Sequence, residues 1–212
     1  MQATRIIAVR HGETAWNVDK RLQGHLNIPL NSLGLWQAEQ VAQALADQAI
    51  DTIYSSDLLR AWQTAQTIAQ AALCPLVAEK GLRERGFGEF EGNTYAEVAE
   101  LFPHDSEMWR TRAPDWAPPR GESLNQMVER VRTTTWALAR QHLGGQIALV
   151  AHGGVLDMLY RLATGQSVQA PRTWQLSNAA INRLLWTPDG LTLVGWSDTS
   201  HLEELSLDEA MS

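Results

Sequence analysis

Two segments of this chain share one pattern, and that pattern constrains the fold more than any other feature. The apolar runs 6–9 and 147–150 are each followed, after one intervening residue, by a histidine and a glycine: His11-Gly12 and His152-Gly153. Short apolar runs of this kind predict buried strands. In open α/β sheets, ligands bind beyond the carboxyl ends of the strands. If the two strands are neighbours, both imidazoles face one crevice. Because the strand, histidine and glycine occur twice in the same order, a functional role for both histidines is favoured over a structural one.

The remaining segments alternate between the patterns of strands and helices. Strands are predicted at 52–55 and 76–78, a hairpin at 181–196, and helices at about 32–48, 58–72, 94 onward, 123–142 and 155–164. Such alternation predicts an α/β fold with a mostly parallel central sheet flanked by helices, which ends in an antiparallel pair. No repeat or linker interrupts it, so residues 1–200 are expected to form one domain.

Local signals predict how some of these segments begin and which faces they bury. Ser32 is the expected cap of the 32–48 helix, with Leu33, Trp36, Val41 and Leu45 as its apolar stripe. Residues 103–121 contain four of the eight prolines and are expected to be an irregular connection within an insertion at about 93–121.

Composition excludes several classes of function. The formal net charge of -7 over 212 residues disfavours a nucleic-acid binder, and an anionic ligand would need positive charge gathered locally. Part of the acidic excess lies in residues 201–212, which are expected to form an acidic tail. One cysteine excludes a disulfide framework, and no metal-ligand or nucleotide-loop pattern occurs, so neither a metal nor another cofactor is expected.

The chain shows no secretory signal and no apolar run near the ~20 residues that span a bilayer. A cytoplasmic protein without membrane contact is therefore expected.

Several motifs together resemble the histidine phosphatase superfamily, the phosphoglycerate mutase-like proteins. The first motif, Val9-Arg10-His11-Gly12-Glu13-Thr14, is followed by others in the family's order: 30–34, 55–61, 82–84 with Gly88 and 91–92, 121–123 and 150–154. The similarity extends over about residues 4–196. It implies a three-layer sandwich and a phosphoryl-transfer site.

The resemblance assigns roles to five residues. His11 is the implied nucleophile, which becomes phosphohistidine, and neighbouring positive charge should keep it neutral. Arg10 and Arg60 are the implied ligands of the phosphoryl oxygens, because guanidinium donors match phosphate geometry. His152 would be a further donor, more useful when protonated. Glu84 is the implied general acid, which would protonate the leaving oxygen and then activate water.

The resemblance also places weaker candidates near the phosphate. Asn17, Gln23 and Gly24 lie in the loop after the first histidine, and Gly153 follows the second. They are expected to contact the phosphate or the substrate, although the first three could equally be ordinary turn residues. Trp16, Trp109 and Trp116 could line an apolar substrate wall or pack beneath a loop.

The segment after Glu84 favours one branch of the family. Residues 84–92 resemble the phosphatase branch, and the following segment lacks the adjacent arginine pair and the lysine that mutases use. We therefore expect a metal-independent phosphomonoesterase acting on a small phosphorylated metabolite. A phosphoglycerate mutase and a non-catalytic phosphate-ligand binder are the alternatives, and assembly as a homodimer is left open.

Overall fold

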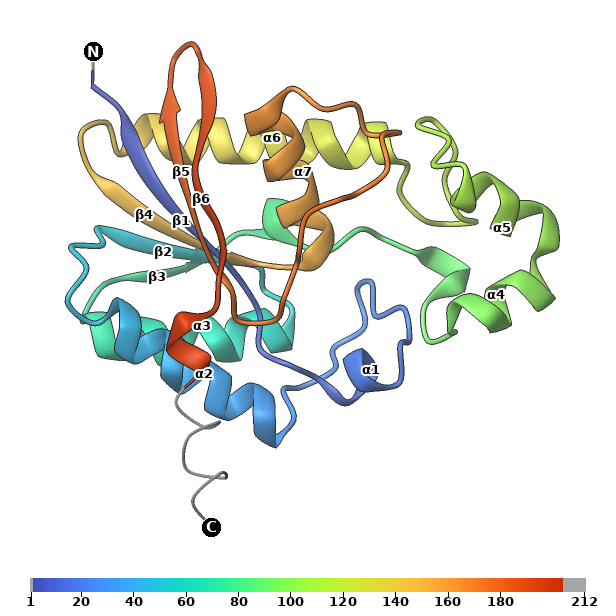
Figure 1. Ribbon diagram of the computed structural model, residues 1–212, viewed down its shortest axis with the longest axis horizontal. Helices are drawn as coiled ribbons and strands as arrows, with labels where there is room; N and C mark the ends of the chain where they lie inside the picture. The colour runs from blue at the N-terminus through green and yellow to red at the C-terminus, as the bar shows by residue number, and fades with distance from the viewer. Residues whose placement is uncertain (1, 204–212) are drawn as a thin grey trace.

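The computed structural model describes residues 2–203, and a six-stranded sheet runs through its centre (Figure 1). The strand order is β3-β2-β4-β1-β5-β6. The strands are β1 (Thr4–Arg10), β2 (Thr52–Ser55), β3 (Leu76–Ala78), β4 (Gln146–Ala151), β5 (Ile181–Thr187) and β6 (Gly190–Asp198). β1 to β4 pair in parallel and β5 and β6 are antiparallel, as the sequence predicted.

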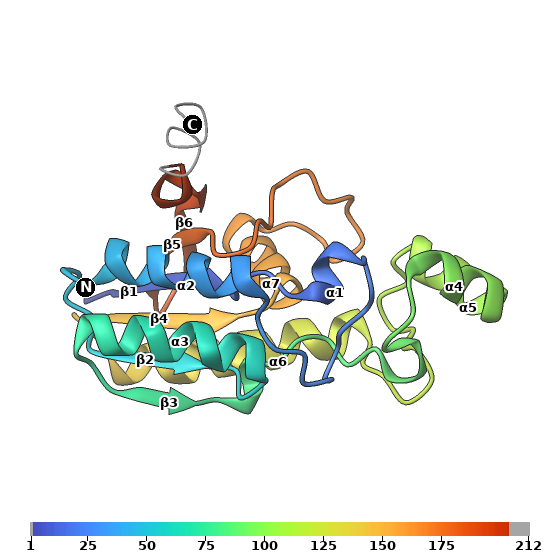
Figure 2. The ribbon, with the colours of Figure 1, turned by 90° about the horizontal axis from the view of Figure 1, so that it is seen from below.

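Two helices cover each face of the sheet, which confirms the predicted three-layer α/β fold (Figures 1 and 2). On one face lie α2 (Ser32–Leu45) and α3 (Leu59–Ala72), and on the other α6 (Leu124–Gln141) and α7 (Gly153–Thr164). Each face has its own apolar core, because the buried strands present apolar side chains on both sides. None of the helices in residues 2–203 has the length and apolarity of a membrane span.

The cap of α2 differs from the prediction. Asn31, and not Ser32, is the N-cap, and its side-chain oxygen accepts a hydrogen bond from the Gly34 N–H at 2.8 Å. Leu33 is exposed, and the buried side of the helix is made by Gly34, Ala38, Val41, Ala42 and Leu45. The small residues let the helix lie close to the loop after β1, where a Cβ on Gly34 would lie 2.0 Å from the Glu13 carbonyl oxygen.

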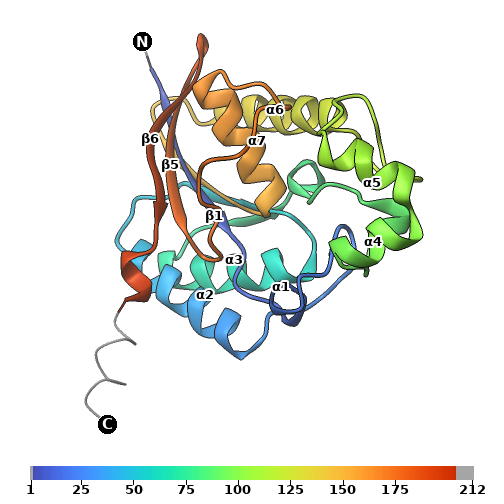
Figure 3. The ribbon, with the colours of Figure 1, turned by 45° about the vertical axis from the view of Figure 1, so that its right-hand side comes forward.

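The insertion is more regular than predicted. It contains α4 (Tyr95–Leu101), capped by Thr94, and a second helix, α5 (Pro103–Arg110). The expected irregular connection at 103–121 is thus wrong for its first eight residues. Pro103 stands in the first turn, where backbone N–H groups have no partner within the helix, so the missing N–H of proline costs no helical hydrogen bond. With the short helix α1 (Ala15–Val18), both helices lie beyond the same end of the sheet (Figure 3).

The predicted tail begins inside the described part of the chain. His201 and Leu202 belong to the 3-10 helix Ser200–Leu202. The His201 Nε2 lies 3.0 Å from the Ala179 carbonyl oxygen, and Leu202 packs on the core that α2 and α3 share. Residues 204–212, the rest of the predicted tail, lie outside the described residues.

Candidate functional site

The register of β1 and β4 brings the two histidines together. Arg10 pairs with Ala151, the residue before His152 in the chain, and the His11 N–H donates to the Ala151 carbonyl at 3.0 Å. The two rings lie 5.2 Å apart between centroids, and both side chains are buried. The single crevice predicted from the repeated pattern is therefore present at the carboxyl ends of neighbouring strands.

The environment of His11 leaves one ring nitrogen unprotonated. Its Nδ1 lies 2.7 Å from the Gly12 carbonyl oxygen, so Nδ1 carries the proton and Nε2 keeps its lone pair. Burial, with the charges of Arg60 and Arg10, holds the pKa of His11 well below its ordinary 6.5. The imidazole is therefore neutral at pH 7, as expected, although burial contributes more than the neighbouring charge.

Arg60 lies in the first turn of α3 and is 1% exposed. Its Nε donates to His11 Nε2 at 3.3 Å, and its two terminal nitrogens donate to the carbonyls of Gly24 and Leu26, each at 2.9 Å. Burial lowers its pKa to about 10, so it stays charged at pH 7. The three bonds hold the guanidinium against the nucleophile.

Arg10 and His152 each present a buried nitrogen without a partner among the described residues. These atoms are Arg10 Nε and His152 Nδ1. A Cβ built on Gly153 would lie 3.5 Å from Arg10 Nε, at van der Waals contact, so the guanidinium lies directly beside this glycine. Buried polar groups are normally hydrogen-bonded. Two nitrogens without a partner beside one nucleophile therefore suit the oxygens of an anionic ligand.

His152 is the expected further donor, and its surroundings favour the neutral ring over the protonated form in which it would be the more useful donor. His152 is fully buried, and its Nε2 lies 2.8 Å from the Ser56 hydroxyl. Burial first, then Arg60, His11 and Arg10, hold the pKa of His152 well below 6.5. The ring is therefore neutral at pH 7 and can still donate one N–H.

Glu84 reaches the same site from the loop after β3. One carboxylate oxygen accepts the Gly154 N–H at 3.1 Å, and the other accepts the Arg85 N–H at 2.8 Å. A Cβ on Gly154 would lie 2.2 Å from Glu84 Oε1, so this glycine makes room for the carboxylate at the start of α7. Glu84 lines the same pocket as His11, Arg10 and Arg60.

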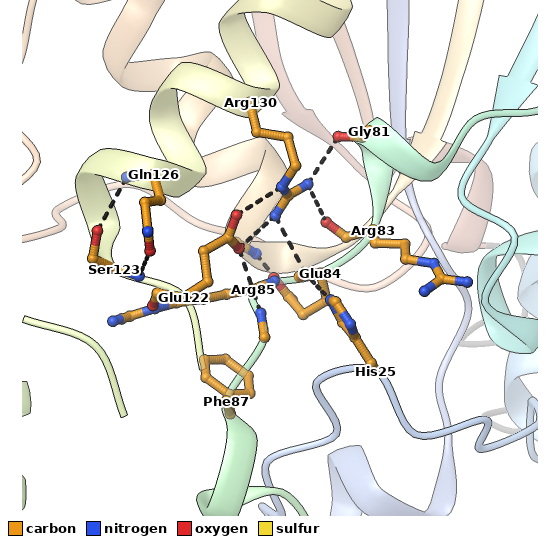
Figure 4. Close-up of polar contacts among 12 residues, drawn as sticks. His25, Gly81, Arg83, Glu84, Arg85, Phe87, Glu122, Ser123, Gln126 and Arg130 are labelled. Atoms are coloured by element: carbon orange, nitrogen blue, oxygen red, sulfur yellow. Dashed lines mark hydrogen bonds and ion pairs between the residues drawn. The ribbon is translucent and has the colours of Figure 1, made fainter. Parts of the chain in front are cut away.

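An ion pair holds the loop that carries Glu84 (Figure 4). Arg130 of α6 binds both carboxylate oxygens of Glu122, at 2.7 and 2.6 Å. Its NH1 also donates to the carbonyls of Gly81 and Arg83, at 2.8 and 2.9 Å. His25 adds a contact of 2.9 Å between its Nε2 and the Glu84 carbonyl oxygen. The sequence contained no local pattern that would indicate this role of Arg130, because the loop carbonyls that it binds belong to residues more than 40 positions away in the chain.

The weaker candidates lie in the pocket wall. Asn17, Gln23, Gly24 and Gly153 all line it. Asn17 closes a capping box with Thr14, and the buried Gln23 Oε1 has no partner among the described residues. Gly24 has a φ of +48°, which glycine adopts without strain, and a Cβ there would lie 2.0 Å from Glu91.

The pocket has a volume of about 540 Å³ and extends from His11 toward the insertion. Trp16 and Trp109 line it, whereas Trp116 packs beneath it against Phe90. Sequence reasoning assigned no role to several other charged residues in its wall, among them Arg85, Asp157 and Arg172. Within residues 2–203, no group of three or more His, Cys, Asp or Glu side chains could hold a metal ion.

Comparisons with known proteins agree with this geometry. The family model of the histidine phosphatase superfamily (branch 1) matches residues 6–199. Two curated relatives come from Arabidopsis thaliana. Phosphoglycerate mutase-like protein 4 is 37% identical (94% of this chain, 87% of the relative), and the metal-independent phosphoserine phosphatase is 36% identical (96% and 85%).

Among solved structures, the mycobacterial glucosyl-3-phosphoglycerate phosphatase superposes with a TM-score of 0.83 at 30% identity. That match covers 93% of this chain and 100% of the other. The sequence motifs, the paired histidines and these similarities agree, and the chain belongs to the histidine phosphatase superfamily, branch 1.

Proposed function

We propose that this chain hydrolyses phosphomonoesters in two steps, through a phosphoryl group carried on His11 Nε2 and without a metal ion. The observation that carries the proposal is the set of groups around that nitrogen. A neutral imidazole has its Nδ1 proton held by Gly12, and Arg60 lies against its Nε2. Two buried donors, Arg10 Nε and His152 Nδ1, have no protein partner among residues 2–203.

The first step would transfer the phosphoryl group to the protein. A bond forms between His11 Nε2 and phosphorus, and the bond from phosphorus to the leaving oxygen breaks. Arg10, Arg60 and His152 would donate to the phosphoryl oxygens, whose charge grows in the transition state. Glu84, in its protonated form, would give its proton to the leaving oxygen.

The second step would return the phosphoryl group to water. Glu84, now a carboxylate, takes a proton from the water as its oxygen bonds to phosphorus. The bond between phosphorus and Nε2 then breaks, and inorganic phosphate leaves. A covalent intermediate divides one difficult displacement into two easier ones.

The relatives support hydrolysis. The chain is a phosphatase of its family, in keeping with its similarity to the phosphoserine and glucosyl-3-phosphoglycerate phosphatases. A small phosphorylated metabolite is the proposed partner. A cytoplasmic location stays a prediction, which cell fractionation tests. Assembly as a homodimer stays open, and light scattering tests it.

Phosphate release in the presence of EDTA tests the proposal. The full-length protein should release phosphate from p-nitrophenyl phosphate with EDTA present, and His11→Ala should not. Undiminished release by His11→Ala would contradict the assignment. Faster interconversion of 2- and 3-phosphoglycerate than their hydrolysis would identify a mutase instead.

A further inference from the structure

The chemistry that His152 offers to a ligand depends on which of its two ring nitrogens carries the hydrogen. Burial above all holds the pKa of this ring well below 6.5, so only one nitrogen is protonated at pH 7. With the hydrogen on Nδ1, that atom can donate to a phosphoryl oxygen. With the hydrogen on Nε2, Nδ1 presents a lone pair, which repels an anion.

The register of the sheet places Ser56 beside this ring. β2 ends at Ser55, which pairs with Val150 of β4, and the Ser56 N–H donates to the Val150 carbonyl at 3.0 Å. Ser56 and His152 therefore follow the ends of two neighbouring parallel strands. Both residues are fully buried, and the Ser56 Oγ lies 2.8 Å from His152 Nε2.

The other contact of the Ser56 hydroxyl indicates the direction of this hydrogen bond. Its Oγ accepts the Leu58 N–H at 3.3 Å, and apart from the bond to His152 it makes no further hydrogen bond with residues 2–203. His152 Nε2 is therefore the one acceptor that the described residues give to the hydroxyl hydrogen. If Nε2 donated instead, that hydrogen would be buried without an acceptor, which costs more than a hydrogen bond contributes.

The surroundings of the other ring nitrogen agree with this direction. His152 Nδ1 is buried and has no partner among the described residues. His152 is also the N-cap residue of α7, but its side chain makes no capping hydrogen bond, so no N–H of the helix requires a lone pair on Nδ1. The centres of the His152 and His11 rings lie 5.2 Å apart. A hydrogen on Nδ1 would therefore find its acceptor in an oxygen of the phosphoryl group that His11 receives.

We propose that Ser56 is a positioning residue, whose hydroxyl donates to His152 Nε2 and so keeps the hydrogen of the ring on Nδ1, where it donates to the phosphoryl group. The inference rests on the proposed phosphatase function and adds a residue that acts on the reaction through His152. The Gly12 carbonyl selects the tautomer of His11 in the complementary way, because it accepts from Nδ1 and leaves the lone pair on Nε2. Each histidine thus has one nitrogen held by the protein and one that serves the phosphoryl group.

NMR of the histidine rings tests the tautomer without turnover. In the full-length protein labelled with ¹⁵N, long-range ¹H–¹⁵N correlations at pH 7 should show the hydrogen of His152 on Nδ1, and the absence of these signals from His152→Gln assigns them. In Ser56→Ala, most of the hydrogen should move to Nε2, the nitrogen that free histidine favours in water. A wild-type ring with its hydrogen on Nε2, or the same tautomer in both proteins, would overturn the proposal.

Ser55→Ala is the matched control. Ser55 is also fully buried and its hydroxyl also donates over 2.8 Å, but to the Ser56 carbonyl and not to an imidazole. It should keep the hydrogen of His152 on Nδ1 and the kcat/KM for phenyl phosphate within about threefold of wild type. Ser56→Ala should lower this kcat/KM about tenfold, the upper value of a neutral hydrogen bond. Equal losses in the two variants would indicate a structural role and contradict the assignment.

A double-mutant cycle shows whether Ser56 acts through His152. His152→Ala should lower kcat/KM about 100-fold or more, as loss of a transition-state donor does. Ser56→Ala added to His152→Ala should lower it less than about twofold further, because the nitrogen on which the hydroxyl acts is gone. A further tenfold loss would contradict the proposal.

Binding of inorganic phosphate separates this proposal from the proposed function. Calorimetry should show phosphate binding about threefold to tenfold weaker in Ser56→Ala than in Ser55→Ala, without any turnover. If wild type releases no phosphate from phenyl phosphate but the tautomer and the binding depend on Ser56, the phosphatase function fails and the positioning role stands. If wild type hydrolyses the ester but neither depends on Ser56, the positioning role fails alone.

Discussion

Replacing Arg130 with glutamine should show how much of the activity depends on the position of Glu84. The substitution removes the bidentate pair with Glu122 and the bonds to the carbonyls of Gly81 and Arg83. Each such bond contributes roughly 1.5–3 kcal/mol, but the two side chains are 24% and 18% exposed, and water replaces part of what is lost. We expect a loss of about 3 kcal/mol, which lowers Tm by about 6–12 °C in a chain of this size.

The effect on activity should depend on the leaving group. Alkyl alkoxides need a proton as they leave, whereas 2,4-dinitrophenolate does not, and a displacement of about 1 Å in a catalytic group can cost about 100-fold. The kcat/KM for an alkyl phosphate should therefore fall about 100-fold in Arg130→Gln, while that for 2,4-dinitrophenyl phosphate stays within about threefold. Because kcat/KM reports only the first phosphoryl transfer, the role of Glu84 in the second step does not affect this comparison.

The assay is steady-state phosphate release below the Tm of each variant, with thermal unfolding measured in parallel. Arg132→Gln is the control, since Arg132 lies on the same helix and pairs with Glu129, and the two side chains are 48% and 60% exposed. It should lower stability by less than about 1 kcal/mol and leave both rates unchanged. An Arg130→Gln enzyme that loses stability but keeps the wild-type ratio of the two rates would refute the positioning of Glu84 by this ion pair.

Three further outcomes follow from the site and its supports. Because the pKa values of His11 and His152 lie well below 6.5 in the folded chain, the unfolded chain binds more protons in acid. The free energy of unfolding should be constant above pH 6.5 and should fall below pH 6.5 by up to about 1.4 kcal/mol per pH unit for each histidine. The decrease in Tm between pH 7 and pH 5 should therefore be smaller in His152→Gln. Gly154→Ala should displace the general acid, whose oxygen would lie 2.2 Å from the new methyl, and lower kcat/KM for alkyl phosphates about tenfold or more with little change in Tm. Asn31→Ala should cost about 1 kcal/mol in a denaturant titration through the lost cap of α2, and Ser32→Ala, the control, should cost almost nothing.

Much of the fold and the centre of the site could be predicted from local patterns. Apolar runs and helical patterns have the same meaning in any chain, and the structure confirms the helices predicted at 123–142 and 155–164. The repeated strand, histidine and glycine placed two side chains at neighbouring strand ends. The meeting of His11 and His152 was therefore predictable once the strands were assumed to pair.

Other features depend on contacts between distant segments and leave no local trace. Asn31 and Ser32 both suit a cap, and Asn31 prevails because its amide also donates to Glu13 at 2.8 Å. The neutrality of His152 follows from burial, which a motif does not report. Arg85 and Asp157 line a pocket whose wall also includes residues of the insertion and of the loop after α7, and the sequence does not show that these segments meet.

The central claim is a covalent phosphohistidine, and trapping that intermediate tests it most directly. Wild-type protein in EDTA is mixed with a phosphomonoester, quenched in the turnover phase and digested under alkaline conditions, in which phosphohistidine survives. Mass spectrometry should find an acid-labile phosphoryl group on His11, and none on any peptide of His11→Ala. Full turnover with no adduct on His11, or an adduct that persists in His11→Ala, would contradict the account.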